Sequence, residues 1–315
     1  MVFAPTPIAF LGREPRLAHK FPATGRPRVL GSASRNLHRD SSRFGYEWRL
    51  GRLTGASYTG TAAQSDEAYS YDANGNRETA NGSTYVTSAG NRLISDGTYT
   101  YSYDAEGNRT AKFIDANADG VLDAGDTSIT VFGWDVRNRL TSVTTYATFG
   151  ADPTQIVQYR YDPENRLVGE AVDSNGDGVV DRQFCFAYDG RQIALQFDKD
   201  GAGAVTAADL SHRYLSAVDQ VFADEQVANP QAAGNVVWPL ADNLGTVRDL
   251  AVSQNGVTSV ANHRVFDSYG NLVSQTNAAV DCVFGFTGLL FDVKLRRTRQ
   301  RRGLPRNWST PARGR

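Results

Sequence analysis

The sequence has few of the residues that disulfide frameworks and metal sites need. Its 315 residues include two cysteines, four histidines and one methionine. Two thiols, Cys185 and Cys282, are too few for a disulfide framework or a four-cysteine metal site, and the sequence leaves open whether they pair. The histidines have no metal-ligand spacing such as His-x-x-x-His. No apolar stretch reaches the roughly 18 residues of a membrane-spanning helix, so we expect no transmembrane segment.

Catalytic signatures are also missing. The sequence has no Gly-x-Ser-x-Gly nucleophile motif, no Walker loop and no dinucleotide-binding fingerprint. Carboxylates are abundant, but they recur with an internal repeat, which makes them poor evidence for a glycosidase. We therefore expect a protein that is not an enzyme, and we assign no catalytic residue and no residue that binds an organic cofactor.

Charge is spread unevenly along the chain. Residues 46–292 hold 32 of the 34 acidic residues but only 16 of the 33 lysines and arginines, a balance of 16 minus 32, or −16. Residues 1–45 hold eight basic and two acidic residues, and residues 293–315 hold nine basic residues and no acidic one. An acidic body with two basic ends suggests separate segments. Residues 1–45 also lack periodicity, so we expect them to form a disordered or artefactual basic leader.

A tyrosine–aspartate repeat dominates the acidic body. The strings YSYDANGNR (residues 69–77) and YSYDAEGNR (residues 101–109) differ at one position, and GWDVRNRL, RYDPENRL and AYDGRQI are looser copies. The alternation Tyr-x-Tyr is typical of a strand with one buried face, and Asp followed by Gly-Asn favours a tight turn. Because one hairpin is only marginally stable alone, we predict an all-β fold of stacked β-hairpins. The aspartates, which are spaced by 32, 31, 27 and 27 residues, are Asp72, Asp104, Asp135, Asp162 and Asp189.

The aromatic residue before each aspartate has two interpretations. It either packs in a ladder on one sheet face or belongs to a surface that stacks on carbohydrate. These residues are Tyr71, Tyr103, Trp134, Tyr161 and Tyr188. We expect the repeat arginines to bond to the aspartate of their own or the next unit, which would set the register more than the stability. These arginines are Arg77, Arg109, Arg139 and Arg166.

These strings resemble the YD repeats of the RHS family over roughly residues 46–292. Within residues 238–292, WPLADNLGTVRDL, VFDSYGNLV and FGFTGLLFD resemble the end of the family's core region. The resemblance implies a spiralling YD-repeat sheet or partial shell, with the repeat region at 46–237 and the core-like terminal segment at 238–292. Bacterial members enclose a C-terminal toxin and animal relatives serve cell-surface adhesion. The resemblance thus implies a structural shell or extracellular scaffold of the toxin-delivery class, secreted or at the cell surface, with an enclosed polypeptide as partner.

The sequence departs from the family pattern after Asp292. The family would continue with a tyrosine-rich strand and the motif that precedes a self-cleaving aspartate, but VKLRRTRQRRGLPRNWSTPARGR follows here. We expect residues 293–315 to be a frame-shifted or truncated end, or a disordered basic tail. A lone arginine-rich run is weak evidence for a tail that binds nucleic acid or membrane, so we expect no nucleic-acid partner. No toxin domain is recognisable. Two alternatives stay open: a secreted module with calcium-stabilised loops that binds a carbohydrate or a protein, and a non-functional gene fragment.

Three Asp-rich segments interrupt the repeat, and two of them suggest calcium. DANADGVLDAGD (residues 115–126) has the spacing of a calcium loop, in which oxygens at alternate positions converge on one ion. Its expected ligands are Asp115, Asn117, Asp119, the carbonyl of Val121, Asp123 and Asp126. DSNGDGVVDRQF (residues 173–184) repeats the beginning with Asp173, Asn175, Asp177 and Asp181, and residues 198–209 are a degenerate copy. We expect EF-hand-like loops without paired helices; the alternative is plain turns whose carboxylates face water.

Overall fold

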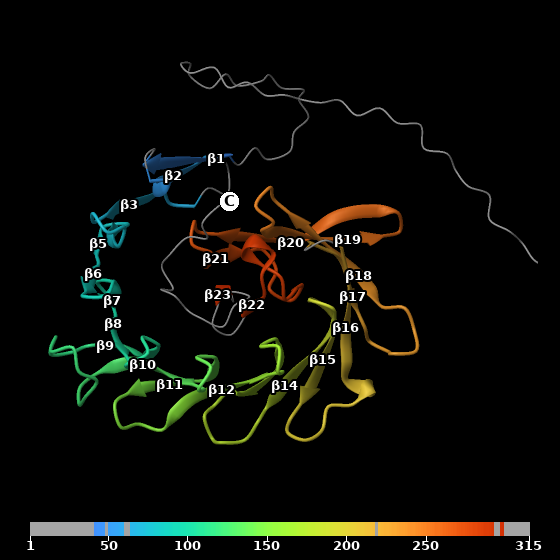
Figure 1. Cartoon of the computed structure of the whole chain (residues 1–315). Coiled ribbons are helices and arrows are strands. Elements are labelled where there is room, and N and C mark those ends of the chain that lie inside the picture. Colours follow the sequence, from blue (N-terminus) through green and yellow to red (C-terminus); the bar gives the residue numbers. More distant parts are fainter. Residues whose placement is uncertain (1–40, 48–49, 60–63, 218–219, 293–296, 299–315) are drawn as a thin grey trace, which may run out of the picture. The chain divides into compact units, whose positions relative to one another are not determined.

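The computed structural model describes residues 41–47, 50–59, 64–217, 220–292 and 297–298 (Figure 1). All of these residues belong to one unit, residues 40–315. Most of the predicted leader (1–45) and of the predicted tail (293–315) therefore lies outside the described residues. The first strand begins at Ser41, five positions before the predicted start of the repeat region. The predicted domain boundaries otherwise stay predictions.

The described residues form antiparallel sheets in which strands follow one another in chain order, which confirms the predicted all-β fold. Two short 3-10 helices, η1 (Ala207–Asp209) and η2 (Phe286–Gly288), interrupt them. A five-stranded sheet contains β1 (Ser41–Glu47), β2 (Arg52–Thr59), β3 (Glu67–Tyr71), β4 (Arg77–Ala80) and β5 (Ser83–Thr84). A two-stranded sheet contains β22 (Phe291–Asp292) and β23 (Arg297–Thr298).

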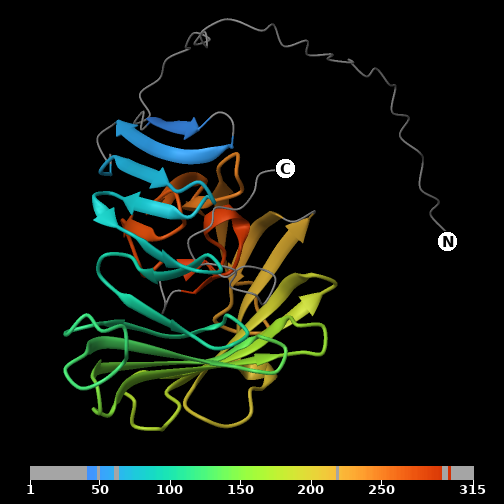
Figure 2. The same ribbon diagram turned by 60° about the vertical axis from the view of Figure 1, so that its left-hand side comes forward.

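The longest sheet has sixteen strands and is open, with β6 and β21 at its edges. Figure 2 shows its middle strands, green to yellow, side by side. In chain order the strands are β6 (Val86–Ser88), β7 (Arg92–Ser95), β8 (Thr100–Tyr103), β9 (Arg109–Ile114), β10 (Thr127–Trp134), β11 (Leu140–Thr148), β12 (Pro153–Tyr161), β13 (Leu167–Asp173), β14 (Arg182–Asp189), β15 (Gln192–Asp200), β16 (Leu210–Ala217), β17 (Gln220–Gln226), β18 (Asn235–Ala241), β19 (Val247–Gln254), β20 (Val257–Phe266) and β21 (Leu272–Gln275).

Each tyrosine–aspartate unit forms a strand, a tight turn and a returning strand, as the repeat predicts. In the first unit the pairing register shifts between Ser70 and Tyr71. Asp72 then closes the turn: its carbonyl accepts the Gly75 N–H at 3.0 Å and its carboxylate accepts the Asn76 N–H at 2.7 Å. Gly75 has a φ of 89°, a conformation that suits glycine because it has no Cβ. Similar register shifts lie immediately before Tyr103, Trp134, Tyr161 and Tyr188.

The main core lies where residues 277–290, here called the C-terminal segment, pack against the long sheet. Val237, Val247 and Leu250 on β18 and β19 are at most 1% exposed and pack with Cys282 and Phe284 of the segment. Each fully buried side chain of this kind contributes about 1.5–3 kcal/mol through removal of apolar surface from water. A second cluster on β11, β12 and β13 contains Val143, Val157, Tyr159, Leu167 and Val172.

Parts of the chain that are 201 residues apart also meet. The Glu67 carboxylate on β3 accepts the Ser268 N–H, in the turn between β20 and β21, at 3.1 Å. The hydroxyls of Tyr71 and Tyr269 lie 2.7 Å apart, and the Arg77 guanidinium lies 3.7 Å from the centroid of the Tyr269 ring. These residues, here called the closing contact, join the five-stranded sheet to the last hairpin of the long sheet.

Candidate functional site

The aromatic residue before each aspartate bonds to the preceding hairpin. The Tyr161 hydroxyl donates to the Leu140 carbonyl at 2.9 Å, and the Trp134 indole N–H donates to the Arg109 carbonyl at 2.8 Å. Equivalent bonds join Tyr71 to Leu53, Tyr103 to Leu93 and Tyr188 to Leu167. The rings are half-buried and tie one hairpin to the next. This arrangement favours the packing interpretation of the aromatic residues over the carbohydrate-stacking one.

The length of the turn decides which side chain bonds to the repeat aspartate. In the shorter turns Arg139 and Arg166 bond to the aspartate four positions earlier, at 2.7 and 2.6 Å, which confirms the predicted pairing for these two. In the longer turns the residue at that position is an asparagine, Asn76 or Asn108. The arginines that follow lie over tyrosine rings instead; the Arg109 guanidinium lies 4.0 Å from the centroid of the Tyr101 ring.

The first predicted calcium loop, residues 115–126, is a turn held by its own side chains. The Asp115 carboxylate accepts the N–H groups of Ala118 at 2.7 Å and Gly120 at 2.8 Å. The next positions are bonded in the same way: Asn117 donates to Asp119, and Asp119 accepts the N–H of Val121. These are the local carboxylate-to-backbone bonds that favour tight turns.

The second half of this loop contains a polar atom without a partner. Asp126 is fully buried and accepts the N–H groups of Ala116 and Asp123, both at 3.0 Å. One carboxylate oxygen of Asp123 is buried and accepts no hydrogen bond. Partial burial, together with the negative charges of Asp119, Asp126 and Asp115, raises the pKa of the Asp123 carboxyl. The carboxylates thus lie close enough to repel one another.

The second predicted loop repeats this arrangement. The Asp173 carboxylate, at the end of β13, accepts the N–H groups of Gly176 at 2.6 Å and Gly178 at 2.7 Å. Asn175 donates to Asp177, Asp177 accepts the N–H of Val179, and Asp181 accepts the N–H of Ser174. The degenerate third copy differs, because its first three residues, 198–200, all belong to strand β15.

A calcium ion is not needed to explain the shape of these loops. Among the residues that the structure describes, no group of three or more His, Cys, Asp or Glu side chains is placed to hold a metal ion. Hydrogen bonds of the predicted ligands hold the turns. Calcium binding at these loops stays a prediction.

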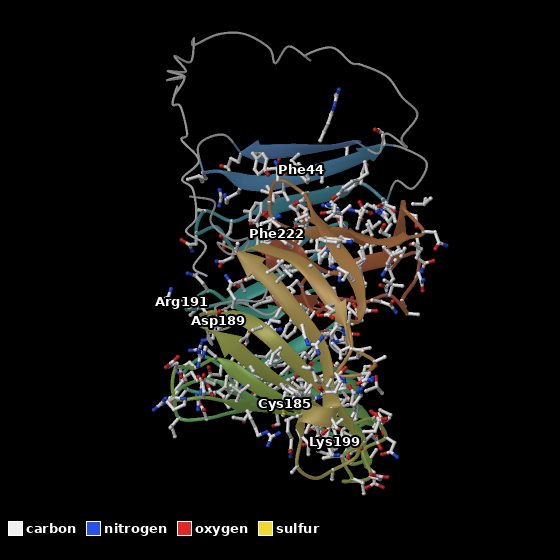
Figure 3. The ribbon with its side chains drawn as sticks, turned by 90° about the vertical axis from the view of Figure 1, so that its right-hand side faces the viewer. Phe44, Cys185, Asp189, Arg191, Lys199 and Phe222 are labelled. Atoms are coloured by element: carbon white, nitrogen blue, oxygen red, sulfur yellow. The ribbon has the colours of Figure 1, made fainter. Side chains whose placement is uncertain are left out.

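The two cysteines are both free. Cys185 is half-buried on β14 (Figure 3), and Cys282 is buried in the C-terminal segment. Burial, with the nearby Asp224 carboxylate, raises the pKa of the Cys282 thiol, so this thiol stays protonated at neutral pH. A protonated, buried thiol is a poor nucleophile.

The C-terminal segment is held to the sheet mainly through its backbone carbonyls. Arg264 donates to the carbonyls of Cys282 at 3.2 Å and Phe284 at 2.6 Å. Asn262 donates to the Val280 carbonyl at 2.8 Å, Gln226 donates to the Asp281 carbonyl at 3.4 Å, and the Val247 N–H donates to the Gly285 carbonyl at 3.0 Å. Backbone carbonyls are the same in every sequence, so these donors can hold a polypeptide with little regard to its side chains.

The main donors come from one face of β20. Asn262, Arg264 and Phe266 alternate along the strand, so they point to the same side. All three are at most 1% exposed. A buried Asn and Arg in line with a buried Phe need hydrogen-bond partners, because burial of an unpaired polar group is costly. No sequence motif predicts a role for Asn262 and Arg264; the available signal is that both polar residues stand at positions of a strand whose side chains point to its apolar face.

A cavity of about 610 Å³ lies between the C-terminal segment and the sheet. Its floor follows paired positions on adjacent strands: Phe186 pairs with Gln196, and Gln196 pairs with His212. Leu290 and Asp281 of the segment also line it. Burial lowers the pKa of His212, so its ring is neutral at neutral pH.

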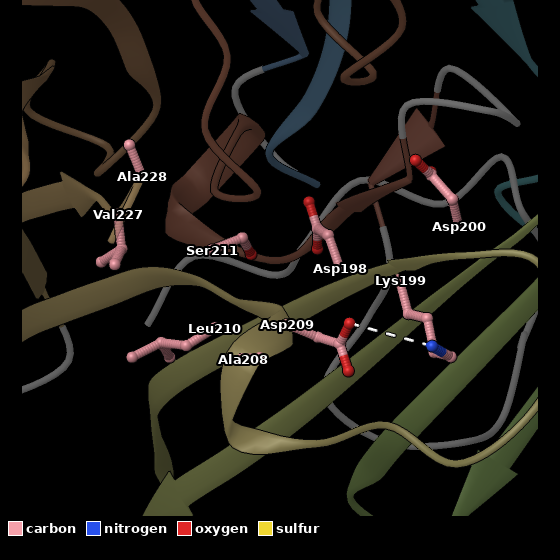
Figure 4. A pocket seen from close by; sticks show the side chains of 9 residues that line it. All are labelled: Asp198, Lys199, Asp200, Ala208, Asp209, Leu210, Ser211, Val227 and Ala228. Carbon is pink, nitrogen blue, oxygen red and sulfur yellow. Dashed lines mark ion pairs between the residues drawn. The ribbon is translucent and has the colours of Figure 1, made fainter. Parts of the chain in front are cut away.

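A smaller cavity of about 410 Å³ lies beside residues 198–211 (Figure 4). The Lys199 ammonium lies 3.9 Å from the Asp209 carboxylate, as the dashed line shows. Asp198 and Ser211 line both cavities. The two cavities therefore adjoin at these residues.

Asp224 is the least satisfied polar residue in this region. It lies on β17, its side chain is 0% exposed, and among the described residues no N–H or O–H group donates to either carboxylate oxygen; its one neighbouring donor is the weakly donating thiol of Cys282. Its nearest basic group is His212, whose Nε2 lies 4.0 Å away. Burial, and then the negative charges of Asp281 and Asp198, raise the pKa of Asp224 to about 8, although Cys282 opposes this rise. The carboxyl is therefore largely neutral at pH 7.

Comparison with known proteins leaves the family unassigned. No protein-family model matches the chain, and no curated protein matches it. No helix among the described residues has the length and apolar character to span a membrane.

Solved structures of Tc toxin components match at low identity. A crystal structure of TcdB2-TccC3 is 15% identical with a TM-score of 0.39, and the Photorhabdus luminescens Tc holotoxin pore is 14% identical with a TM-score of 0.40. A crystal structure of TcdB2-TccC3-Cdc42 is 14% identical with a TM-score of 0.39. Each match covers 80% of this chain but only 16% of the solved chain. The likeness is too distant to assign a family or a function.

Proposed function

We propose that this chain is a structural segment of an RHS-type β-sheet shell that holds a polypeptide against one face of the sheet. The observation that carries this proposal is the capture of five carbonyls between Val280 and Gly285. Four of the bonds come from the side chains of Asn262, Arg264 and Gln226, and one comes from the Val247 N–H. Such donors recognise backbone, and so they suit a wall that must accept varied sequences.

The repeat suits a wall for a separate reason. Each aromatic residue and each turn ties one hairpin to its neighbour, so hairpins can be added in sequence without a new core for each. The proposed role is therefore structural. In line with the family resemblance, the shell would belong to the toxin-delivery class, would be secreted or exposed at the cell surface, and would have no toxin domain in this chain. The enclosed partner would be a polypeptide.

A reporter peptide tests the shell. The same flexible peptide with one protease site is fused either after the last residue or before the first residue of the full chain. We expect slower cleavage of the C-terminal fusion, because its attachment follows the segment that the sheet holds. The variant Arg264→Met should bring the two cleavage rates together. Equal rates at both ends of the unmutated chain would refute the shell proposal.

We also propose calcium as a structural ion of residues 115–126. The favouring observation is the buried, unpartnered Asp123 oxygen among mutually repelling carboxylates. An ion that binds only the folded state stabilises it by about 2.7 kcal/mol when free calcium is 100 times the dissociation constant. We therefore expect millimolar calcium to raise the melting temperature relative to chelator.

Two matched variants locate the effect. Asp119→Asn should abolish the rise in melting temperature, whereas Asp177→Asn, at the same position of the second loop, should remove at most part of it. An equal melting temperature in chelator and in calcium for the unmutated chain would eliminate the ion. In that case the carboxylates serve only as hydrogen-bond acceptors within the turns, and these hydrogen bonds alone account for the shape of the loops.

A further inference from the structure

A fully buried carboxyl group lies where the C-terminal segment meets the sheet. Asp224 pairs across the sheet with Tyr214 on β16 and with Val237 on β18, and paired side chains point to the same face. Tyr214 and Val237 both belong to the cluster that packs against Cys282 and Phe284 of the segment. Asp224 therefore points toward the segment and not toward water.

The groups that face Asp224 provide no positive charge and almost no hydrogen-bond donors that would stabilise a carboxylate. From β16 come His212, neutral at pH 7, and the buried phenol of Tyr214, whose own pKa is raised chiefly by burial. From β15 comes the carboxyl of Asp198, and from the segment come Asp281 and the thiol of Cys282. Arg264, on β20, is turned to Asp281 at 3.8 Å and to the segment carbonyls.

An ionised carboxylate in such surroundings is costly. Removal of an ion from water without hydrogen-bond donors costs several kcal/mol. Asp224 becomes exposed if β17 separates from its neighbours or if the segment moves away from the sheet. The strands share continuous backbone ladders, whereas the segment is attached by a handful of side-chain bonds and by packing. Movement of the segment is therefore the easier route.

We propose that Asp224 is a proton-operated latch for the C-terminal segment: the neutral acid lets the segment pack against the sheet, and the carboxylate loosens it. The proposal rests on the proposed function in one respect only, since the segment represents the polypeptide that the shell holds. It adds a means of regulation to that site. A shell of this kind would hold its polypeptide most firmly in acidic surroundings and less firmly as the pH rises through neutrality to about 8.

The direction follows from linkage. The folded-state pKa of Asp224, about 8, lies above the value of roughly 3.9 for an aspartate in an unfolded chain. A group with a raised pKa contributes stability that is full below the unfolded value and is lost as the pH rises through the folded value. The hold on the segment should therefore weaken progressively as the pH rises from about 4 to about 8, and should change little above pH 8, where the carboxyl is ionised in both states.

Hydrogen exchange of residues 277–290 in the full chain tests the latch. Protection is compared between the unmutated protein and Asp224→Asn at equal pH from 6 to 9.5, so that intrinsic exchange rates cancel. Between pH 6 and about pH 8 we expect the ratio of their protection factors to change by up to tenfold per pH unit, as one linked proton requires, and above pH 8 we expect the ratio to level off. Residues 153–161 of β12 serve as an internal reference, and Asp189→Asn, at the exposed end of β14 (Figure 3), is the matched control.

The outcomes are distinct. Loss of protection with rising pH in the unmutated protein and in Asp189→Asn, but not in Asp224→Asn, would support the latch. The same pH dependence in all three proteins, or none in any, would overturn it. Titration of the Asp224 carboxyl carbon by NMR is an independent check on the unmutated protein, and a midpoint near 4 would also overturn it. The exchange experiment needs no fused reporter, so the latch proposal and the shell proposal can be refuted independently of each other.

Discussion

Replacement of Arg264 by methionine should lower the free energy of unfolding by about 3–5 kcal/mol, as expected when one partner of a buried charged network is removed. The guanidinium is 1% exposed and donates to three carbonyls, those of Val247, Cys282 and Phe284. Methionine fills similar space but donates nothing, so these buried carbonyls lose their partner at a cost of about 1–3 kcal/mol each before relaxation. Urea denaturation at pH 7, followed by tryptophan fluorescence, measures the loss.

Two further variants show whether the carbonyl bonds are the cause. Arg264→Lys keeps the charge but replaces the planar, five-donor guanidinium by a single ammonium group. Its free energy of unfolding should therefore lie between that of the unmutated protein and that of Arg264→Met. Arg248→Met is the control, because Arg248 is about one-third exposed and bonds only to Asp242 among the contacts seen; its effect should stay below about 1 kcal/mol. An Arg264→Met protein as stable as Arg248→Met would contradict the role of Arg264.

Replacement of Glu67 by alanine should open the closing contact and cost about 2–4 kcal/mol, since hydrogen bonds to a charged group contribute about 1.5–3 kcal/mol each. The Glu67 carboxylate is 7% exposed and accepts bonds from the Tyr58 hydroxyl at 2.7 Å, from the Tyr69 hydroxyl and from the Ser268 N–H at 3.1 Å. Burial raises the pKa of Tyr58 to about 12, so this phenol remains a donor across the neutral range.

In Glu67→Ala the closing contact itself should open locally, in addition to the loss in the free energy of unfolding of the whole protein. Hydrogen exchange of residues 266–271 should accelerate in Glu67→Ala, because the Ser268 N–H loses its acceptor, while β11 to β13 should be unchanged. Glu67→Gln keeps one acceptor oxygen and should show a smaller effect. Glu78→Ala, at an exposed position of β4, is the matched control and should leave both measurements unchanged. If residues 266–271 exchange equally in all three variants, Glu67 does not hold the two ends together.

Much of the fold could be predicted from the repeat because its chemistry is local. Tyr-x-Tyr alternation, an aspartate that accepts N–H groups three or four positions later, and Gly or Asn at the positive-φ position all act within one hairpin. Gly75 and Gly107 have φ of 89° and 87°, and Asn138 and Asn165 have 57° and 65° in the shorter turns. Register shifts beside each aromatic residue follow from the same local unit.

The Asp-rich loops were predictable for a similar reason, although only in part. Asp115 and Asp173 each accept N–H groups five positions or fewer along the chain, so sequence spacing alone located both turns. Whether their carboxylates also converge on an ion depends on where the second half of the loop lies. That position is set by the pairing of the strands on either side, and the sequence does not report it.

The residues that hold the C-terminal segment escaped prediction because their partners are distant. Arg264 and Asn262 bond to residues 18 to 20 positions away in an irregular segment, and Asp224 meets Cys282 only because β16, β17 and β18 lie under that segment. No periodicity encodes such encounters. A polar residue on the apolar face of a strand shows that a partner must exist, but it does not identify the partner.

The sequence by itself therefore determined the stacked hairpins of this protein, their turns and the bonds between neighbouring units, since these depend on residues close together in the chain. Only the tertiary structure decided that Glu67 meets Ser268, that Arg264 donates to the carbonyls of the C-terminal segment, and that Asp224 is buried with no stronger donor than the Cys282 thiol. Each of these contacts depends on the accumulated twist and register shifts of many successive hairpins. The sequence of a single repeat unit does not determine that accumulated geometry.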